Sequence, residues 1–92
     1  MSKVYMKSDH IKFTYQIEVL KKRHDTWEGK AVGKKTYLNT GNLFTESFDI
    51  GSFNGFSEKQ VRDELIKLIE TQKGFDAQEM RNLAESYTET IE

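Results

Sequence analysis

The 92-residue sequence contains no cysteine, no proline and no long hydrophobic run. Without cysteine the chain offers no disulfide framework, no thiolate metal site and no cysteine nucleophile. No segment approaches the ~20 apolar residues that span a membrane, and the start of the sequence, Met1 to Tyr5, lacks the apolar stretch of a signal peptide. We therefore expect a cytoplasmic protein that does not enter a membrane.

Recognisable catalytic and cofactor-binding motifs are also missing. The only histidines, His10 and His24, fall at opposite ends of one predicted strand, too far apart to share a metal ion. The segment 29–36 has the composition of a phosphate-binding loop, but it is one residue short and precedes a turn instead of a helix. The sequence thus predicts no metal, no cofactor and no enzyme activity.

The charged residues, 32% of the chain, nearly balance overall but not along its length. Residues 1–46 contain nine Lys and Arg against five Asp and Glu, whereas residues 47–92 contain five against ten. Two alternative explanations fit this asymmetry. One is charge complementarity between neighbouring layers, and the other is a basic face that meets an anionic partner. Neither half is as basic as a dedicated nucleic-acid binder.

An alternation of apolar and polar residues organises the first half of the chain. Odd positions from Ile11 to Val19 are apolar and even ones polar, as in a strand with one buried face. We expect strands over 10–22, 27–38 and 43–50, with a hairpin turn at 39–42, where the sequence reads Asn-Thr-Gly-Asn. Residues 1–9 are either a lead-in with an edge strand at 4–6 or a loose segment.

The second half has the period of helices. Ser57 and Gln60 match a capping box, and Gly74 is a typical helix stop. A second helix is expected to begin at Asp76, with Glu79 three residues later. Its apolar stripe consists of Met80, Leu83, Ala84, Tyr87 and Ile91.

These patterns predict a single α+β domain over residues 1–92. It is a three-stranded antiparallel β-meander followed by two α-helices (β-β-β-α-α), with at least one helix packed on the sheet. A core of this size leaves little room for a deep substrate cavity.

A cluster of basic and aromatic residues in the first two strands is the candidate site. Its members are Lys21, Lys22, Arg23, Trp27, Lys30, Lys34, Lys35 and Tyr37. If these strands pair around residues 23–26, the cations gather at one end of the sheet, where they could contact phosphates while the aromatic rings stack on bases. In the other interpretation, Trp27 and Tyr37 belong to the core and the lysines protect a sheet edge against strand addition.

The order of the elements is similar to that of two families of DNA-reading domains. Three antiparallel strands, with Trp27 in the second, lead through Ile50-Gly51-Ser52-Phe53 to a helix that begins Ser57-Glu58-Lys59-Gln60-Val61. This outline resembles AP2-type and integrase arm-binding domains, which implies a sheet that enters the major groove. The chain departs from that pattern by an inserted Asn54-Gly55, a longer first hairpin, few arginines and an extra acidic helix.

We expect a small non-catalytic protein-binding module, a bacterial or phage-encoded regulator or inhibitor that acts by protein–protein interaction. Its large apolar residues exceed what one small core absorbs, and such residues are common at interfaces. The alternative is a nucleic-acid-binding domain that uses the basic face of the sheet. The sequence does not identify the protein partner, and a homodimer through the last helix or an open sheet edge is a further expectation.

Overall fold

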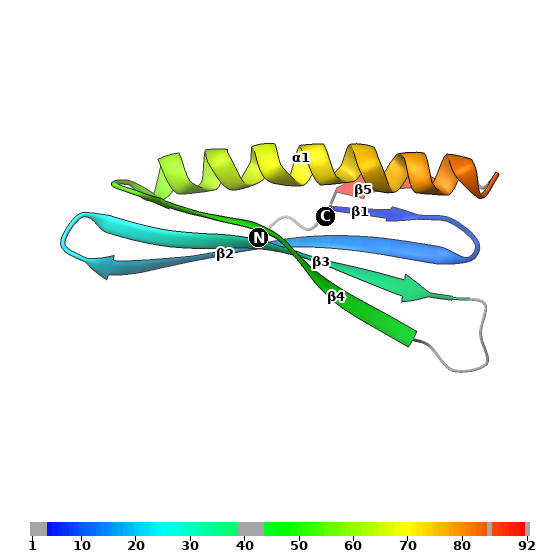
Figure 1. Cartoon of the computed structure of the whole chain (residues 1–92), viewed down its shortest axis with the longest axis horizontal. Helices are drawn as coiled ribbons and strands as arrows, with labels where there is room; N and C mark the ends of the chain where they lie inside the picture. The colour runs from blue at the N-terminus through cyan, green and yellow to red at the C-terminus, as the bar shows by residue number, and fades with distance from the viewer. Residues whose placement is uncertain (1–3, 39–43, 85, 92) are drawn as a thin grey trace.

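The computed structural model describes residues 4–38, 44–84 and 86–91, and within them one antiparallel sheet carries one helix (Figure 1). The elements in chain order are β1 (Val4–Lys7), β2 (Ile11–Arg23), β3 (Thr26–Tyr37), β4 (Phe44–Gly55), α1 (Glu58–Asn82) and β5 (Thr88–Ile91). The strand order across the sheet is β4-β3-β2-β1-β5. The molecule is elongated, 48 × 24 × 20 Å, because three of the strands are long.

β2 follows the predicted alternation, and its helix-facing side forms the centre of the core. Phe13 is only 1% exposed, and Tyr15 is also buried. Met6 of β1 lies opposite Phe13 and is buried with it. Farther along β2 the same side is less well covered, since Ile17 and Val19 are only half buried.

The prediction of two helices is wrong, because α1 runs unbroken from Glu58 to Asn82. Gly74 does not end the helix, since the residues that follow have their own contacts with the sheet. Asp76 is buried and accepts a hydrogen bond from the Tyr15 hydroxyl at 2.7 Å. Met80, one turn later, is fully buried. These contacts outweigh the weak local preference of glycine for a helix end.

The prediction of three strands is also wrong, because two short terminal strands extend the sheet to five. β1 pairs with β2 and β5 pairs with β1, so that Val4 lies between Tyr15 and Ile91. The chain leaves α1 at Leu83, and Ala84 adopts a left-handed conformation with φ 59°. The segment that was expected to continue a helical stripe therefore turns back and forms β5.

β4 is longer at its C-terminal end than predicted. It continues through residues 51–55, beyond the predicted end of the strand at residue 50, and contains a bulge at Ile50, where Ala31 pairs with Gly51 and Val32 with Asp49. The predicted hairpin turn at 39–42 and the start of the third strand at residue 43 lie outside the described residues.

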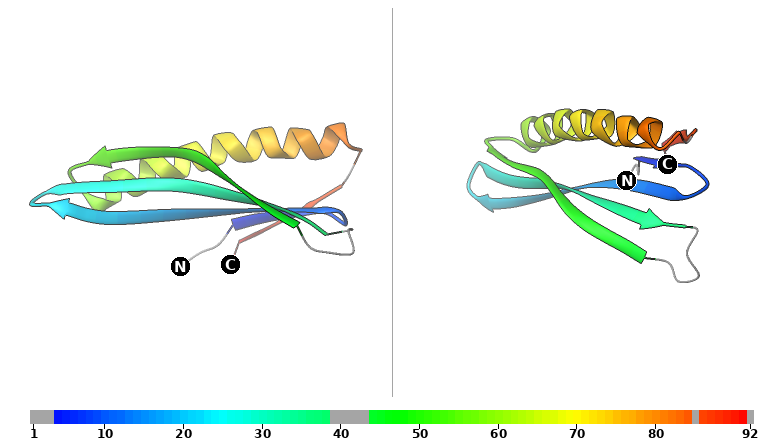
Figure 2. Two further views of the ribbon diagram at one scale, coloured as in Figure 1. Left: turned by 60° about the horizontal axis from the view of Figure 1, so that its bottom comes forward. Right: turned by 45° about the vertical axis from the view of Figure 1, so that its right-hand side comes forward.

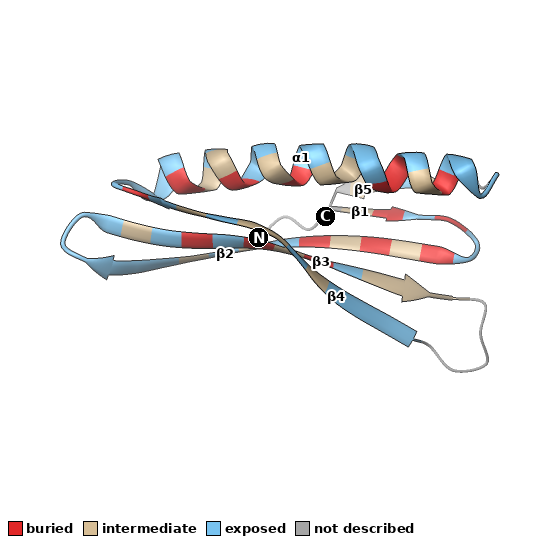
Figure 3. Ribbon diagram, viewed as in Figure 1, coloured by how far each residue is buried: buried red, intermediate tan, exposed pale blue. Residues whose placement is uncertain are grey.

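α1 is seated on the sheet through glycines. A Cβ added at Gly29 of β3 would lie 2.4 Å from Val61 Cγ1 and 2.7 Å from Leu65 Cδ1, and one added at Gly51 of β4 would lie 2.8 Å from Leu68 Cδ1. The N-terminal half of α1 therefore lies on β3 and β4 (Figure 2), whereas in its C-terminal half Asp76 contacts Tyr15 of β2 and Lys73 contacts Glu89 of β5. The buried residues of α1 are on its sheet-facing side (Figure 3).

Candidate protein-interaction site

The predicted basic cluster does not form one surface. The pairing register places half of its members on the side that carries α1: Lys21, Trp27, Lys35 and Tyr37. On the opposite, open face of the sheet lie Lys22, Lys30 and Lys34, and Arg23 is exposed at the end of β2. The structure thus divides the eight residues between two faces and a strand end.

Lys35 is a partner of α1 rather than a free surface cation. Its Nζ lies 2.8 Å from Oε1 of Glu79, and its side chain is only 15% exposed. The same Nζ is 5.6 Å from the Phe13 ring centroid and 5.1 Å from that of Tyr37. Burial lowers the pKa of Lys35, but hydrogen bonds with Glu79 and Tyr37 outweigh this effect and leave the pKa raised. The ion pair between Lys35 and Glu79 therefore links β3 to α1.

The aromatic members of the cluster are partly buried. Trp27 and Tyr37 both pack against the core, and Tyr37 also stacks on Phe44 with ring centroids 5.9 Å apart. The Lys21 Nζ lies 5.8 Å from the Trp27 ring centroid. Both rings cover the edge of the core on the helix side.

On the open face, two of the predicted lysines are paired with acids. Lys22 Nζ lies 3.3 Å from Glu28 Oε2, and Lys30 Nζ lies 3.5 Å from Glu18 Oε2. These pairs are half exposed and contribute little to stability. Lys34 is exposed and makes no ion pair with any described residue.

Two further lysines on the open face were missed by the sequence analysis. Lys7 and Lys12 lie directly opposite each other on β1 and β2, and Lys12 Nζ is 4.6 Å from the Tyr5 ring centroid. Lys34 lies two residues along β3 from the position opposite Lys12. We call Lys7, Lys12 and Lys34 the lysine patch. It depends on the pairing of β1, for which the sequence contains no clear signal.

A buried polar group links the helix to the centre of the sheet. Asp76 accepts hydrogen bonds from Tyr15 at 2.7 Å and from Gln72 Nε2 at 2.9 Å. Burial raises the pKa of Asp76, although both hydrogen bonds partly offset it. Burial also raises the pKa of Tyr15, and Asp76 adds to that effect. The two side chains hydrogen-bond each other, so this arrangement fixes α1 on β2.

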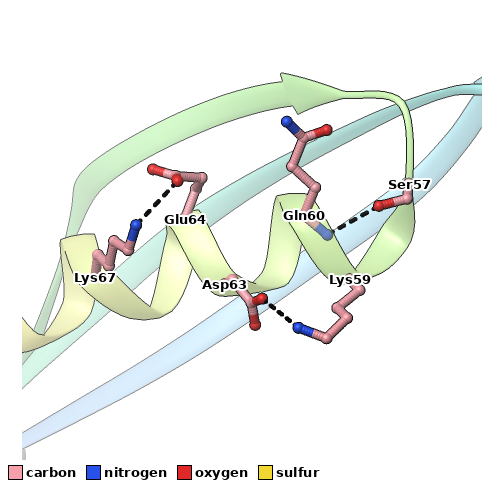
Figure 4. Close-up of a pocket in the computed structure, with 6 residues that line it drawn as sticks. All are labelled: Ser57, Lys59, Gln60, Asp63, Glu64 and Lys67. Carbon is pink, nitrogen blue, oxygen red and sulfur yellow. Dashed lines mark hydrogen bonds and ion pairs between the residues drawn. The ribbon is translucent and has the colours of Figure 1, made fainter.

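A shallow hollow of about 500 Å³ lies on the N-terminal half of α1 (Figure 4). Its lining residues are Ser57, Lys59, Gln60, Asp63, Glu64 and Lys67. Ser57 caps the helix as predicted, and the charged residues pair with one another along the helix, Lys59 with Asp63 and Lys67 with Glu64. The hollow is thus bounded by a helix cap and by solvated ion pairs.

The most distinctive unpaired feature is one edge of β2. β2 pairs with β3 from Ile11 to Arg23, but it pairs with the shorter β1 only from Lys12 to Tyr15. Within the described part of the chain, residues 16–23 have no strand on the β1 side, and the β2–β3 hairpin projects beyond β1 and β5 (Figures 1 and 2). We call residues 16–23 the open edge.

The backbone groups of the open edge point outward at alternate residues. Ser8 N donates a hydrogen bond to Ile11 O across the β1–β2 turn, so the odd residues of β2 direct their N–H and C=O groups toward the β1 side. Beyond β1 these groups belong to Ile17, Val19 and Lys21. Such a row of donors and acceptors can pair with a strand from another chain.

Apolar side chains accompany this row. Leu20 on the open face is 63% exposed, while Ile17 and Val19 on the other face are half buried. β2 has thirteen residues and the described β1 has four, and this difference in length indicates the open edge. The sequence alone does not reveal the edge, because it contains no clear signal for β1.

No three described side chains come together as metal ligands, and among the same residues no helix is long and apolar enough to cross a membrane. The resemblance to DNA-reading domains rested on a sheet of three strands followed by a helix. The observed sheet differs from that pattern, because β1 and β5 extend it. The fold and the site define an α+β protein with one helix on a five-stranded antiparallel sheet and an open strand edge. Compared with protein-family models, curated proteins and solved structures, the chain matches none.

Proposed function

We propose that this protein is a non-catalytic protein-binding module that accepts a strand of its partner on the open edge of β2. It would act as a small regulator or inhibitor by binding a strand of its partner. The observation that carries the proposal is the row of outward N–H and C=O groups at Ile17, Val19 and Lys21, which no described strand of the chain pairs.

The first part of the open edge lacks the usual protection against strand addition. Natural edge strands are shielded by proline, bulges, lysines or inward-pointing charges. Residues 16–20 contain no proline or lysine and only one charge, that of Glu18, and the bulge of β2 comes only after Lys21. Ile17 and Val19 on one face and Leu20 on the other can contact alternate side chains of an added strand.

A selection from a display library of short random peptides tests the proposal. We expect extended peptides with alternating apolar residues to be enriched on the wild-type protein. Val19→Pro removes an N–H that points to the open edge and is not needed for pairing with β3, so it should abolish binding without unfolding the protein. Phe75→Lys, at a residue that is 68% exposed on α1, is the matched control and should bind as the wild type does. Peptides that bind Val19→Pro equally well, or no enrichment at all, would contradict the proposal.

The lysine patch supports nucleic-acid binding as a second candidate function. Lys7 and Lys12 are like charges in directly opposed positions, which is unfavourable, and none of the three lysines makes an ion pair with a described residue. Lysine side chains on an open face can contact phosphates. If this function is correct, affinity for nucleic acid should fall steeply with salt and drop on Lys12→Glu or Lys34→Glu, but not on Lys67→Glu on α1. Binding that does not change with salt would exclude it.

A further inference from the structure

We propose that the strand accepted by the open edge is the same segment of a second copy of this chain. The two sheets would then join through their β2 strands around a two-fold axis at Leu20. This inference rests on the proposed function, because it names the partner of that same edge.

The outward backbone groups of the open edge determine the position of the axis. Among the described residues, β2 pairs with β1 only up to Tyr15, and beyond it the residues that direct backbone groups outward are Ile17, Val19 and Lys21. In an antiparallel pair of identical segments, residues equally distant from the axis lie opposite each other and point to the same face. Leu20 lies between Val19 and Lys21, so an axis there sets these two residues opposite each other before the bulge of β2 that follows Lys21.

The side chains on the open face are self-complementary in this register. Leu20 would lie against the partner's Leu20, and each is 63% exposed in the single chain. Glu18 would lie opposite the partner's Lys22, and Lys22 opposite the partner's Glu18. Opposite charges and paired apolar residues in such positions both stabilise a sheet.

These charges would extend pairs that already exist within each chain. Lys30 pairs with Glu18, and Lys22 pairs with Glu28. Across the two-fold axis the order becomes Lys30, Glu18, the partner's Lys22 and the partner's Glu28. The signs alternate across four neighbouring strands, which is the arrangement that charge complementarity requires.

The backbone groups also match. Val19 and Lys21 both direct N–H and C=O groups outward, and in this register Val19 lies opposite the partner's Lys21. The two symmetry-related pairs would form about four backbone hydrogen bonds. Leu20 occupies a position without outward backbone groups, where the facing side chains of an antiparallel pair come closest.

Neighbouring registers lack this complementarity. An axis at Glu18 sets Glu18 against itself, and an axis at Lys21 sets Lys21 against itself. An axis at Val19 places Glu18 opposite Leu20 and leaves Lys22 opposite Gln16. Only the axis at Leu20 combines the charge pairs, the apolar contact and the facing backbone groups of Val19 and Lys21. Its small area predicts a weak, concentration-dependent dimer.

A single engineered thiol tests this register, since the wild-type chain has no cysteine. In the proposed dimer the Leu20→Cys sulfurs are close enough for a disulfide. We expect Leu20→Cys to form a disulfide-linked dimer under mild oxidation about ten-fold faster than Phe75→Cys, because the dimer raises the effective thiol concentration. Light scattering of the wild type should show the mass rising from 10.8 kDa toward twice that value with concentration. Leu20→Lys should remain monomeric, whereas Leu83→Lys, at another exposed leucine, should not.

The outcomes separate this inference from the proposed function. A monomer at all concentrations, with equal cross-linking of the two cysteine variants, overturns the dimer. If that monomer still binds peptides in a manner sensitive to Val19→Pro, the strand-accepting edge stands. If it binds none, both proposals fail. A dimer that Leu20→Lys does not weaken uses another surface and also overturns the inference.

Discussion

The hydrogen bond between Tyr15 and Asp76 gives the sharpest test of how the helix is held on the sheet. Tyr15 is 3% and Asp76 5% exposed, and their oxygens are 2.7 Å apart. Tyr15→Phe removes the donor to Oδ2 and leaves Gln72 as the described donor to Asp76. A hydrogen bond to a buried charged group contributes about 1.5–3 kcal/mol. We therefore expect the free energy of unfolding at pH 7 to fall by about 2 kcal/mol, which lowers Tm by roughly 10 °C in a domain of this size.

The loss should depend on pH. Burial raises the pKa of Asp76 above its ordinary value of 3.8, so the folded protein keeps this proton to a higher pH than the unfolded chain does. Protonation of Asp76 stabilises the folded state fully at pH values below the pKa that this group has in the unfolded chain. This stabilisation is lost as the pH rises through the pKa of Asp76 in the folded protein. Tyr15→Phe removes a hydrogen bond that favours the ionised carboxylate and so raises this pKa further. The difference between variant and wild type should therefore shrink to about 1 kcal/mol near pH 3, where the lost bond is between neutral groups.

Urea denaturation of both proteins across this pH range measures the effect. Tyr5→Phe is the matched control, because it removes the same hydroxyl from a half-buried residue on the open face and should change stability by less than about 0.5 kcal/mol. If Tyr15→Phe loses no more than Tyr5→Phe, or if its loss is the same at pH 3 and pH 7, Asp76 is not a buried acceptor of this bond.

Three further substitutions test the seating and the continuity of the helix, each by urea denaturation. Gly29→Ala should lower the free energy of unfolding by about 1–3 kcal/mol, because its Cβ would clash with Val61 and Leu65; an unchanged value would show that the helix is not seated there. Gly74→Ala should raise stability by about 0.5–1 kcal/mol, since its Cβ meets nothing within 4 Å inside a continuous helix, whereas a decrease would indicate a helix break at this residue. Ser57→Ala should cost about 1 kcal/mol through loss of the helix cap, and no cost would show that the cap does not form in solution.

The sequence predicts a structural feature correctly where the pattern that indicates it lies within a few neighbouring residues. The alternation from Ile11 to Val19 and the cap at Ser57 both correspond to observed features. The same reasoning failed at Gly74, where a glycine before Asp76 and Glu79 resembles a helix stop and a new start. Asp76 instead bonds to Tyr15, 61 residues away, and no local pattern reveals that contact.

The division of the basic cluster illustrates a second limit. Lys34 and Lys35 are neighbours in sequence, yet one is exposed on the open face and the other is paired with Glu79 on the opposite side. Strand alternation alone implies that adjacent residues separate in this way. The face on which the helix lies decides which lysine is covered. The sequence pattern predicts the strands but not the face that the helix covers, so lysines of both faces were predicted to form one cluster.

The open edge follows from the geometry of one straight helix on a twisted sheet. At 25 residues α1 is about 37 Å long, and strand twist rotates the sheet beneath it along that length. The helix therefore lies on Gly29 and Gly51 at its start, whereas near its end Asp76 bonds to Tyr15 of β2 and Lys73 pairs with Glu89 of β5.

The second half of β2 extends past the short strand β1. It pairs with β3, and Ile17 and Val19 pack against the edge of the core. As described, β1 reaches only to the position opposite Tyr15, so on our proposal the missing strand is supplied by a partner. In this fold the uncovered edge and the proposed function have the same physical origin, which is why a substitution at Val19 or Leu20 should affect binding far more than folding.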